Sequence, residues 1–140
     1  MAGFRFVISD KSKSYNIEKE KGECPIMGKK IGDSINGDFL GLPGFELQIT
    51  GGSDKDGFPM RNDIEGVARK RFLITKGKGF AGWKKIRKKK VMIDGYKRKK
   101  TLRGNSIGSD ISQLNCKVVK APQPIESILK PKEETTEKKE

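Results

Sequence analysis

Histidine is absent from this chain of 140 residues. Its absence removes the commonest general acid–base residue at neutral pH, the commonest nitrogen ligand of zinc, and every mechanism that needs a Ser-His or Cys-His pair. Cysteine occurs only at Cys24 and Cys116, without the CxxC spacing of a zinc site. We therefore expect two buried free thiols, no bound metal and no cofactor.

Long apolar runs are missing as well. No stretch of about 18 apolar residues exists, so no segment is predicted to cross a membrane. The opening residues, MAGFRFVISD, lack the apolar core of roughly 7–15 residues that a secretory signal requires. Both absences predict an intracellular protein that is not attached to a membrane.

Acidic residues are scarce in one part of the chain. The net charge is +13, but residues 69–103 hold sixteen Lys or Arg and one acid, Asp94. This quarter of the chain therefore carries +15, and the remainder carries −2. Such an excess predicts a polyanionic partner, because unbalanced like charges repel one another and concentrate anions around them. Nucleic acid fits best, and an anionic membrane surface fits less well.

Short segments of alternating apolar and polar residues predict a mainly β protein. Phe4, Phe6 and Ile8, for example, fall on one face of the first segment. We expect a small β-barrel or curled antiparallel sheet with a basic arm and a flexible C-terminal tail. The expected strands are 3–9, 13–20, 45–50, 66–75, 90–93 and 114–121, with short strands and turns across 24–44. Residues 83–90 are interpreted as an extended arm, with a helical turn as the alternative.

The chain is predicted to divide into a β-rich domain over 1–120 and a disordered or extended charged tail over 121–140. The tail holds three prolines and mixed charge, a composition that cannot repay the entropy of folding by itself. Its apolar side chains, Ile125, Ile128 and Leu129, offer the alternative of a short segment that docks on a partner.

The segment KGKGFAGWKK (76–85) interleaves glycine, aromatic and lysine residues. Glycine allows close approach to phosphates, aromatic rings can stack on bases, and lysines neutralise phosphate charge. This mixture favours RNA, which exposes unstacked bases that duplex DNA does not. Trp83 fits either a core position or a base-stacking position. The predicted RNA-binding residues are Arg61, Arg69, Arg71, Lys76, Lys78, Trp83, Lys84, Lys85, Arg87, Lys88, Lys89, Lys97, Arg98, Lys99, Lys100 and Arg103.

The loop GGSDKDGFPM (51–60) is predicted to hold one fixed shape. Asp-Gly favours a tight turn, and Pro59 restrains Phe58 before it. The predicted structural residues are Gly51, Gly52, Gly57, Phe58 and Pro59. The spacing of a calcium loop is not met, because the glycine after Asp54 arrives two positions early.

Two further motifs resemble sites of other proteins. Gly77, Gly79 and Gly82 spell GxGxxG, but the lysine-rich run that follows does not predict the helix of a dinucleotide site. Asp54, Asp56 and Asp63 are the only candidate carboxylates for an enzyme acting on RNA, and they could equally hold nearby lysines in place.

Two stretches, QITGGSDKDGFPMR (48–61) and TLRGNSIGSDISQLNCKVVK (101–120), together resemble one family. This is the archaeal and eukaryotic family of small-subunit ribosomal proteins numbered six, which is unrelated to the bacterial protein of that number. Both motifs occur in the family's order and spacing, and the basic, glycine-rich segment lies between them. The resemblance extends over about 1–120.

The resemblance implies a structural component of the small ribosomal subunit that binds its rRNA and neighbouring small-subunit proteins. It implies a cytoplasmic protein with no catalytic activity and no small-molecule substrate. The mixed tail lacks the basic helix and regulated serines of eukaryotic members and is similar to the short archaeal form. Cys116 stands where the family often has an aliphatic residue. The alternative is a free RNA-binding protein or RNA chaperone.

Overall fold

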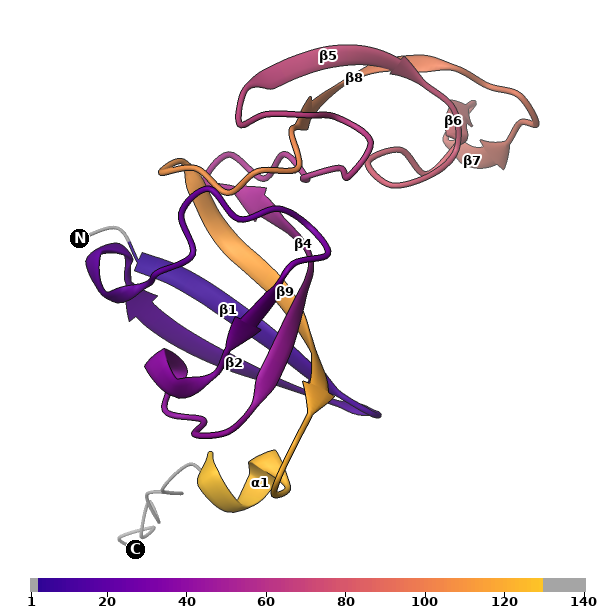
Figure 1. Ribbon diagram of the computed structural model, residues 1–140. Coiled ribbons are helices and arrows are strands. Elements are labelled where there is room, and N and C mark those ends of the chain that lie inside the picture. The colour runs from indigo at the N-terminus through magenta and orange to yellow at the C-terminus, as the bar shows by residue number, and fades with distance from the viewer. Residues whose placement is uncertain (1–2, 130–140) are drawn as a thin grey trace, which may run out of the picture.

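The computed structural model describes residues 3–129 and contains one curled sheet and two separate β-ribbons (Figure 1). The sheet has the strand order β2-β1-β9-β4-β3. Its members are β1 (Gly3–Asp10), β2 (Lys13–Glu20), β3 (Ser34–Asn36), β4 (Glu46–Asp54) and β9 (Ile111–Lys120). Neighbouring strands are antiparallel except β1 and β9, which are parallel. The predicted mainly β fold with a curled sheet is confirmed, although this one pair is not antiparallel.

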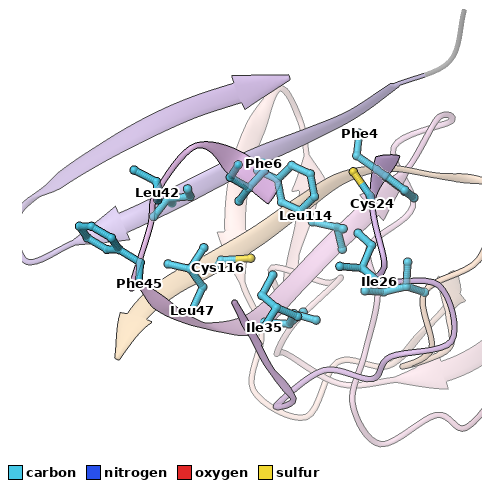
Figure 2. Packing of buried hydrophobic residues seen from close by; sticks show 14 of the residues in the cluster. Phe4, Phe6, Cys24, Ile26, Ile35, Leu42, Phe45, Leu47, Leu114 and Cys116 are labelled. Atoms are coloured by element: carbon cyan, nitrogen blue, oxygen red, sulfur yellow. The ribbon is translucent and has the colours of Figure 1, made fainter. Parts of the chain in front are cut away.

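The sheet wraps around one hydrophobic core. Phe4, Phe6 and Ile8 of β1 are buried on its inner face, as their alternation predicts. Figure 2 shows Leu47 of β4 and Cys116 of β9 among the side chains that fill the same core. Register shifts in β4 near residues 46, 50 and 54 are irregularities of the type that bends a strand, and they help the sheet to curl. We call this sheet, with the loops and short helices packed on it, the body.

The short helices of the body are one-turn elements. They are η1 (Lys21–Glu23), η2 (Asp38–Leu40) and α1 (Ile125–Ile128). No helix within residues 3–129 is long and apolar enough to cross a membrane.

Residues 69–103 form the two ribbons, which we call the arm. One ribbon pairs β5 (Arg69–Ile74) with β8 (Arg98–Arg103), and the other pairs β6 (Trp83–Ile86) with β7 (Lys89–Met92). The arm projects beyond the ends of β4 and β9, at the opposite end of the body from α1 (Figure 1). Only Ile74, Phe80 and Leu102 form a buried cluster here, with Phe72 and Tyr96 half-buried against it.

The structure corrects the predicted arm in two ways. Residues 83–90 are neither a helical turn nor a single extended segment, because β6 turns back on β7 as a hairpin. Residues 98–103 form β8, which was not predicted because four of its six residues are Lys or Arg. Pairing with β5 rather than its own apolar pattern makes this segment a strand.

The predicted division at residue 120 stays a prediction, but the described part of the tail contains a helix that packs on the body. Residues 125–128 form α1, whose Ile125 is buried in the body's core and whose Glu126 pairs with Lys13 of β2. Ile128 and Leu129 pack against the same core, so the apolar side chains expected to dock on a partner lie on the body of the chain itself. Residues 130–140 of the predicted tail lie outside the described residues.

The two cysteines are free and buried, as predicted. Burial raises the pKa of the Cys116 thiol to about 12 and also raises the pKa of Cys24. Both side chains therefore act as small apolar core residues.

Candidate nucleic-acid interface

The β5–β8 ribbon has two unlike faces, which follow from its register. Arg71 lies opposite Thr101 and Leu73 lies opposite Lys99, and this face is largely exposed. On the other face, Leu102 is fully buried and lies opposite the exposed Lys70. Both faces of the ribbon therefore carry exposed basic side chains, and only the face of Leu102 also packs on the buried cluster of the arm.

The β6–β7 ribbon is a hairpin whose turn residues, Arg87 and Lys88, both have positive φ of 44° and 68°. Two successive positive φ values fit the tight turns that match the twist of a two-residue hairpin. All eight strand residues are exposed. Trp83 belongs to neither buried cluster, and the Nζ of Lys90 lies 4.7 Å from its ring centroid. Its location therefore rules out a core role for Trp83, whose partly exposed ring has the Lys90 ammonium over one face.

The glycine-rich loop between β5 and β6 is a tight turn. Gly77 and Phe80 exchange backbone hydrogen bonds of 2.9 and 3.1 Å. Gly79 has φ +90°, and a Cβ there would lie 2.5 Å from Cδ2 of Leu102. Close packing thus requires this glycine. Because β6 rather than a helix follows, the GxGxxG spacing does not form a dinucleotide site.

The predicted structural loop closes the end of β4. Gly51 and Gly52 lie within β4, Gly57 has φ +87° at the turn, and Pro59 bridges back to Ser53. A Cβ on Gly52 would lie 2.5 Å from the carbonyl oxygen of Gln113 in β9, so only glycine fits between the two strands.

Asp54 holds this loop in shape. Its Oδ1 accepts hydrogen bonds from the N–H groups of Asp56 and Phe58, at 3.0 and 2.9 Å. The backbone N–H of Gly57 donates to the carbonyl oxygen of Asp54 at 3.0 Å. The loop is therefore fixed by a carboxylate inside its own turn.

The same carboxylate joins the body to the arm. Its Oδ2 accepts hydrogen bonds from Nη2 of Arg69 and Nε of Arg103, both at 2.9 Å. Arg103 also donates to the carbonyl oxygen of Val67 at 3.0 Å and to Asp110 at 3.2 Å. The Asp54 side chain is fully buried, and that of Arg103 is 6% exposed. We call Asp54, Asp56, Arg69, Arg103 and Asp110 the ionic junction.

The electrostatics of the junction favour an ionised Asp54. Burial alone would raise the pKa of its carboxyl. Hydrogen bonds from Arg103 and the Phe58 N–H, with the charge of Arg69, outweigh burial and hold the pKa of Asp54 below its ordinary value. A buried carboxylate that stays charged is a strong fixed anchor for both arginines.

Arg69 and Arg103 lie opposite each other at the base of the β5–β8 ribbon. The carboxylate therefore binds both strands of the ribbon at once. The Arg69 guanidinium also lies 4.7 Å from the ring centroid of Phe58. The loop after β4 thus sets where the ribbon leaves the body.

The predicted RNA-binding residues fall into three settings. Arg103 is buried and Arg69 is ion-paired in the junction, while Arg61 is half-buried beside Asp63 at 2.9 Å. Lys100 is half-buried, with its Nζ 5.7 Å from the Phe80 ring centroid. The remaining predicted residues are exposed: Arg71, Lys76, Lys78, Trp83, Lys84, Lys85, Arg87, Lys88, Lys89, Lys97, Arg98 and Lys99.

The carboxylates predicted to hold lysines hold arginines instead. Asp54 and Asp56 pair with Arg69, and Asp63 pairs with Arg61. Arginine suits these positions because its planar fork can serve several acceptors at once. Sequence reasoning missed Asp110, which follows a glycine-rich stretch with no local signal of its arginine partner.

Comparison with known proteins identifies the family. A family model described as "Ribosomal protein S6e" matches residues 4–130. The small ribosomal subunit protein eS6 of Methanosphaera stadtmanae is 46% identical over 116 residues, which cover 82% of each chain. The protein of that name from Methanothermobacter thermautotrophicus is 43% identical over 133 residues, covering 94% of this chain and 98% of that one. The family resemblance predicted from residues 48–61 and 101–120 is confirmed, and the chain belongs to the ribosomal protein S6e family.

Proposed function

We propose that this chain is a structural constituent of the small ribosomal subunit in the cytoplasm, where it binds rRNA and neighbouring small-subunit proteins. The observation that carries the proposal is the charge of the arm. Residues 69–103 carry +15 and project from a body that carries −2 overall. The names of the relatives, small ribosomal subunit protein eS6, support the same role.

The arm suits rRNA because its basic side chains are dense and exposed. Each phosphate contact releases condensed counterions, so six or more contacts give a log–log salt slope on the order of −5. The exposed basic residues of the arm are the proposed phosphate contacts. Arg69 and Arg103 are proposed to orient the arm rather than to bind RNA, because their hydrogen bonds go to Asp54 and its neighbours.

The loop at 51–60 is proposed to be a support and contact element. Its turn is fixed from within by Asp54, while Phe58 remains half-buried at its surface. A catalytic role for Asp54, Asp56 and Asp63 is not supported, because Asp54 is fully buried and all three acids pair with arginines.

A density gradient of native lysate tests the proposal. The chain should comigrate stoichiometrically with the small subunit at low salt and at about 0.5 M salt, because a resident protein keeps its non-electrostatic contacts when phosphate contacts are screened. Recovery in light fractions, or release at modest salt, would instead identify a transient RNA-binding protein or chaperone.

A further inference from the structure

The β6–β7 hairpin exposes apolar side chains on both of its faces. Cross-strand partners share a face, so Trp83 and Met92 lie together on one side. By alternation, Ile86 and Val91 lie on the opposite side. These four side chains are 37%, 53%, 44% and 39% exposed, in the order named.

Two apolar faces are unusual for an exposed ribbon. A strand of the body buries one face and hydrates the other, as β1 does with Phe4 and Phe6 inside. No residue of β6 or β7 is buried or half-buried, so neither face packs on the described part of the body. Isolated two-stranded hairpins are marginally stable in water, and a partner on each side would stabilise this one.

The charge of the hairpin indicates the chemistry of that partner. Residues 83–92 contain six Lys or Arg and no acid. Each face combines its apolar pair with two lysines: Lys85 and Lys90 beside Trp83, and Lys84 and Lys89 beside Ile86. A protein partner would have to supply many acids to both faces. Nucleic acid supplies phosphates for the lysines together with bases and riboses for the apolar side chains.

We propose that the β6–β7 hairpin inserts between two segments of rRNA, so that RNA covers both faces. Trp83 stacks on an unpaired base on one side, with Met92 beside it. Ile86 and Val91 contact bases or riboses on the other side. Arg87 and Lys88 at the turn reach phosphates beyond the insertion. This inference rests on the proposed function and specifies how the arm binds.

Site-directed crosslinking in assembled small subunits tests the insertion. A photo-crosslinking amino acid is placed, one position at a time, at Trp83, at Ile86 and at Met27. Met27 is the matched control, because it is an apolar body residue that is 52% exposed. The expected result is an rRNA adduct from the variant at Trp83 and from the variant at Ile86, and no rRNA adduct from the variant at Met27.

Two outcomes would overturn the insertion while leaving the function intact. One is an rRNA adduct from only one of the two hairpin positions, which would mean one-sided docking. The other is an adduct to a protein from either face. Failure of all three variants and of the unaltered chain to enter the subunit would reject the proposed function itself.

The unaltered chain provides a second measurement. Trp83 is the only tryptophan, so its fluorescence reports on the hairpin alone. When purified small-subunit rRNA binds the full-length protein, quenching of Trp83 by acrylamide should be largely lost. Binding with Trp83 as accessible as in the free protein would contradict the insertion.

Discussion

The body and the arm differ in what holds them together. Among the described residues, the core cluster of the body contains seventeen buried residues, whereas that of the arm contains three. Their net charges also differ: the arm carries +15, whereas the rest of the chain carries −2. The body can therefore fold by burying apolar surface, while the arm combines strong self-repulsion with little burial.

The ionic junction connects these two regions. Asp54 fixes a turn of the body and both strands at the base of the arm with one carboxylate. A buried ion pair adds little net stability compared with an apolar contact, but it fixes geometry when every partner is satisfied. The arm is thus oriented by contacts within the chain itself, whereas its β6–β7 hairpin is exposed.

The largest expected effect tests whether the body folds independently of the arm. Phe6→Ala removes a fully buried ring from the body and should reduce the free energy of unfolding by about 3–5 kcal/mol. Leu102→Ala removes a fully buried side chain from the arm and should expose arm amides to hydrogen exchange while body amides stay protected. Hydrogen exchange followed by mass spectrometry measures the loss of unfolding free energy in Phe6→Ala and the loss of arm protection in Leu102→Ala.

Equal loss of protection in body and arm after Leu102→Ala would contradict independent folding of the body. In that case the two regions would form one cooperative unit, and the small cluster of the arm would be part of the main core.

The next effect concerns the junction. Asp54→Asn keeps the shape of the turn but removes the buried charge on which Arg103 lies, so that only the exposed Asp110 remains as a charged partner of Arg103. This change should cost about 3 kcal/mol in urea unfolding at neutral pH. Asp63→Asn is the control, because the Asp63 side chain is 56% exposed and surface pairs contribute at most about 1 kcal/mol. A similar small cost for both variants would refute a structural role for the junction.

The stability cost of Asp54→Asn should depend on pH, and the pKa of Asp54 gives the direction of that dependence. The pKa of Asp54 is lower in the folded protein than its ordinary value of 3.8. Ionised Asp54 therefore contributes its full stability above pH 3.8, and that contribution is lost as the pH falls through the folded value. The stability difference between Asp54→Asn and the unaltered protein should shrink on acidification, and a constant difference would contradict this.

A smaller effect is expected on RNA binding from the arm. Reversing Lys84 and Lys85 to Glu should weaken binding to small-subunit rRNA about tenfold or more and reduce the salt slope by roughly 1.5–2. The matched control is Lys117→Glu, which changes an exposed lysine on β9 of the body. Binding isotherms at several salt concentrations provide both quantities, and equal losses from the arm and the body would remove the distinction between them.

The sequence predicted the body better than the arm for a physical reason. Alternating apolar residues such as Phe4, Phe6 and Ile8 carry the signal of a half-buried strand, and the structure confirms it. The strand β8 consists mainly of Lys and Arg, so its sequence has no apolar alternation from which its pairing with β5 could be predicted.

The sequence indicated which charged residues belong to the site, but it did not indicate how they pair in space. Composition located the basic quarter and the loop, yet Arg103 was grouped with the exposed lysines although it is buried on Asp54. A local sequence does not indicate which arginine meets which distant acid. Arg103 and Asp54 are 49 residues apart and meet only once β4 and β8 are in place.

The smallest expected effect lies where the two regions meet. Phe58→Leu keeps apolar bulk but removes the ring beneath the Arg69 guanidinium, which should cost about 0.5–1 kcal/mol in urea unfolding. The salt slope of rRNA binding should not change, because no phosphate contact is removed, whereas the fit to the cognate site should weaken slightly. Phe58→Tyr keeps an aromatic face and should behave as the unaltered protein. A change in slope as large as that of the Lys84 and Lys85 reversal would mean that the loop binds phosphate as the arm does, and the division between a supporting loop and a binding arm would fail.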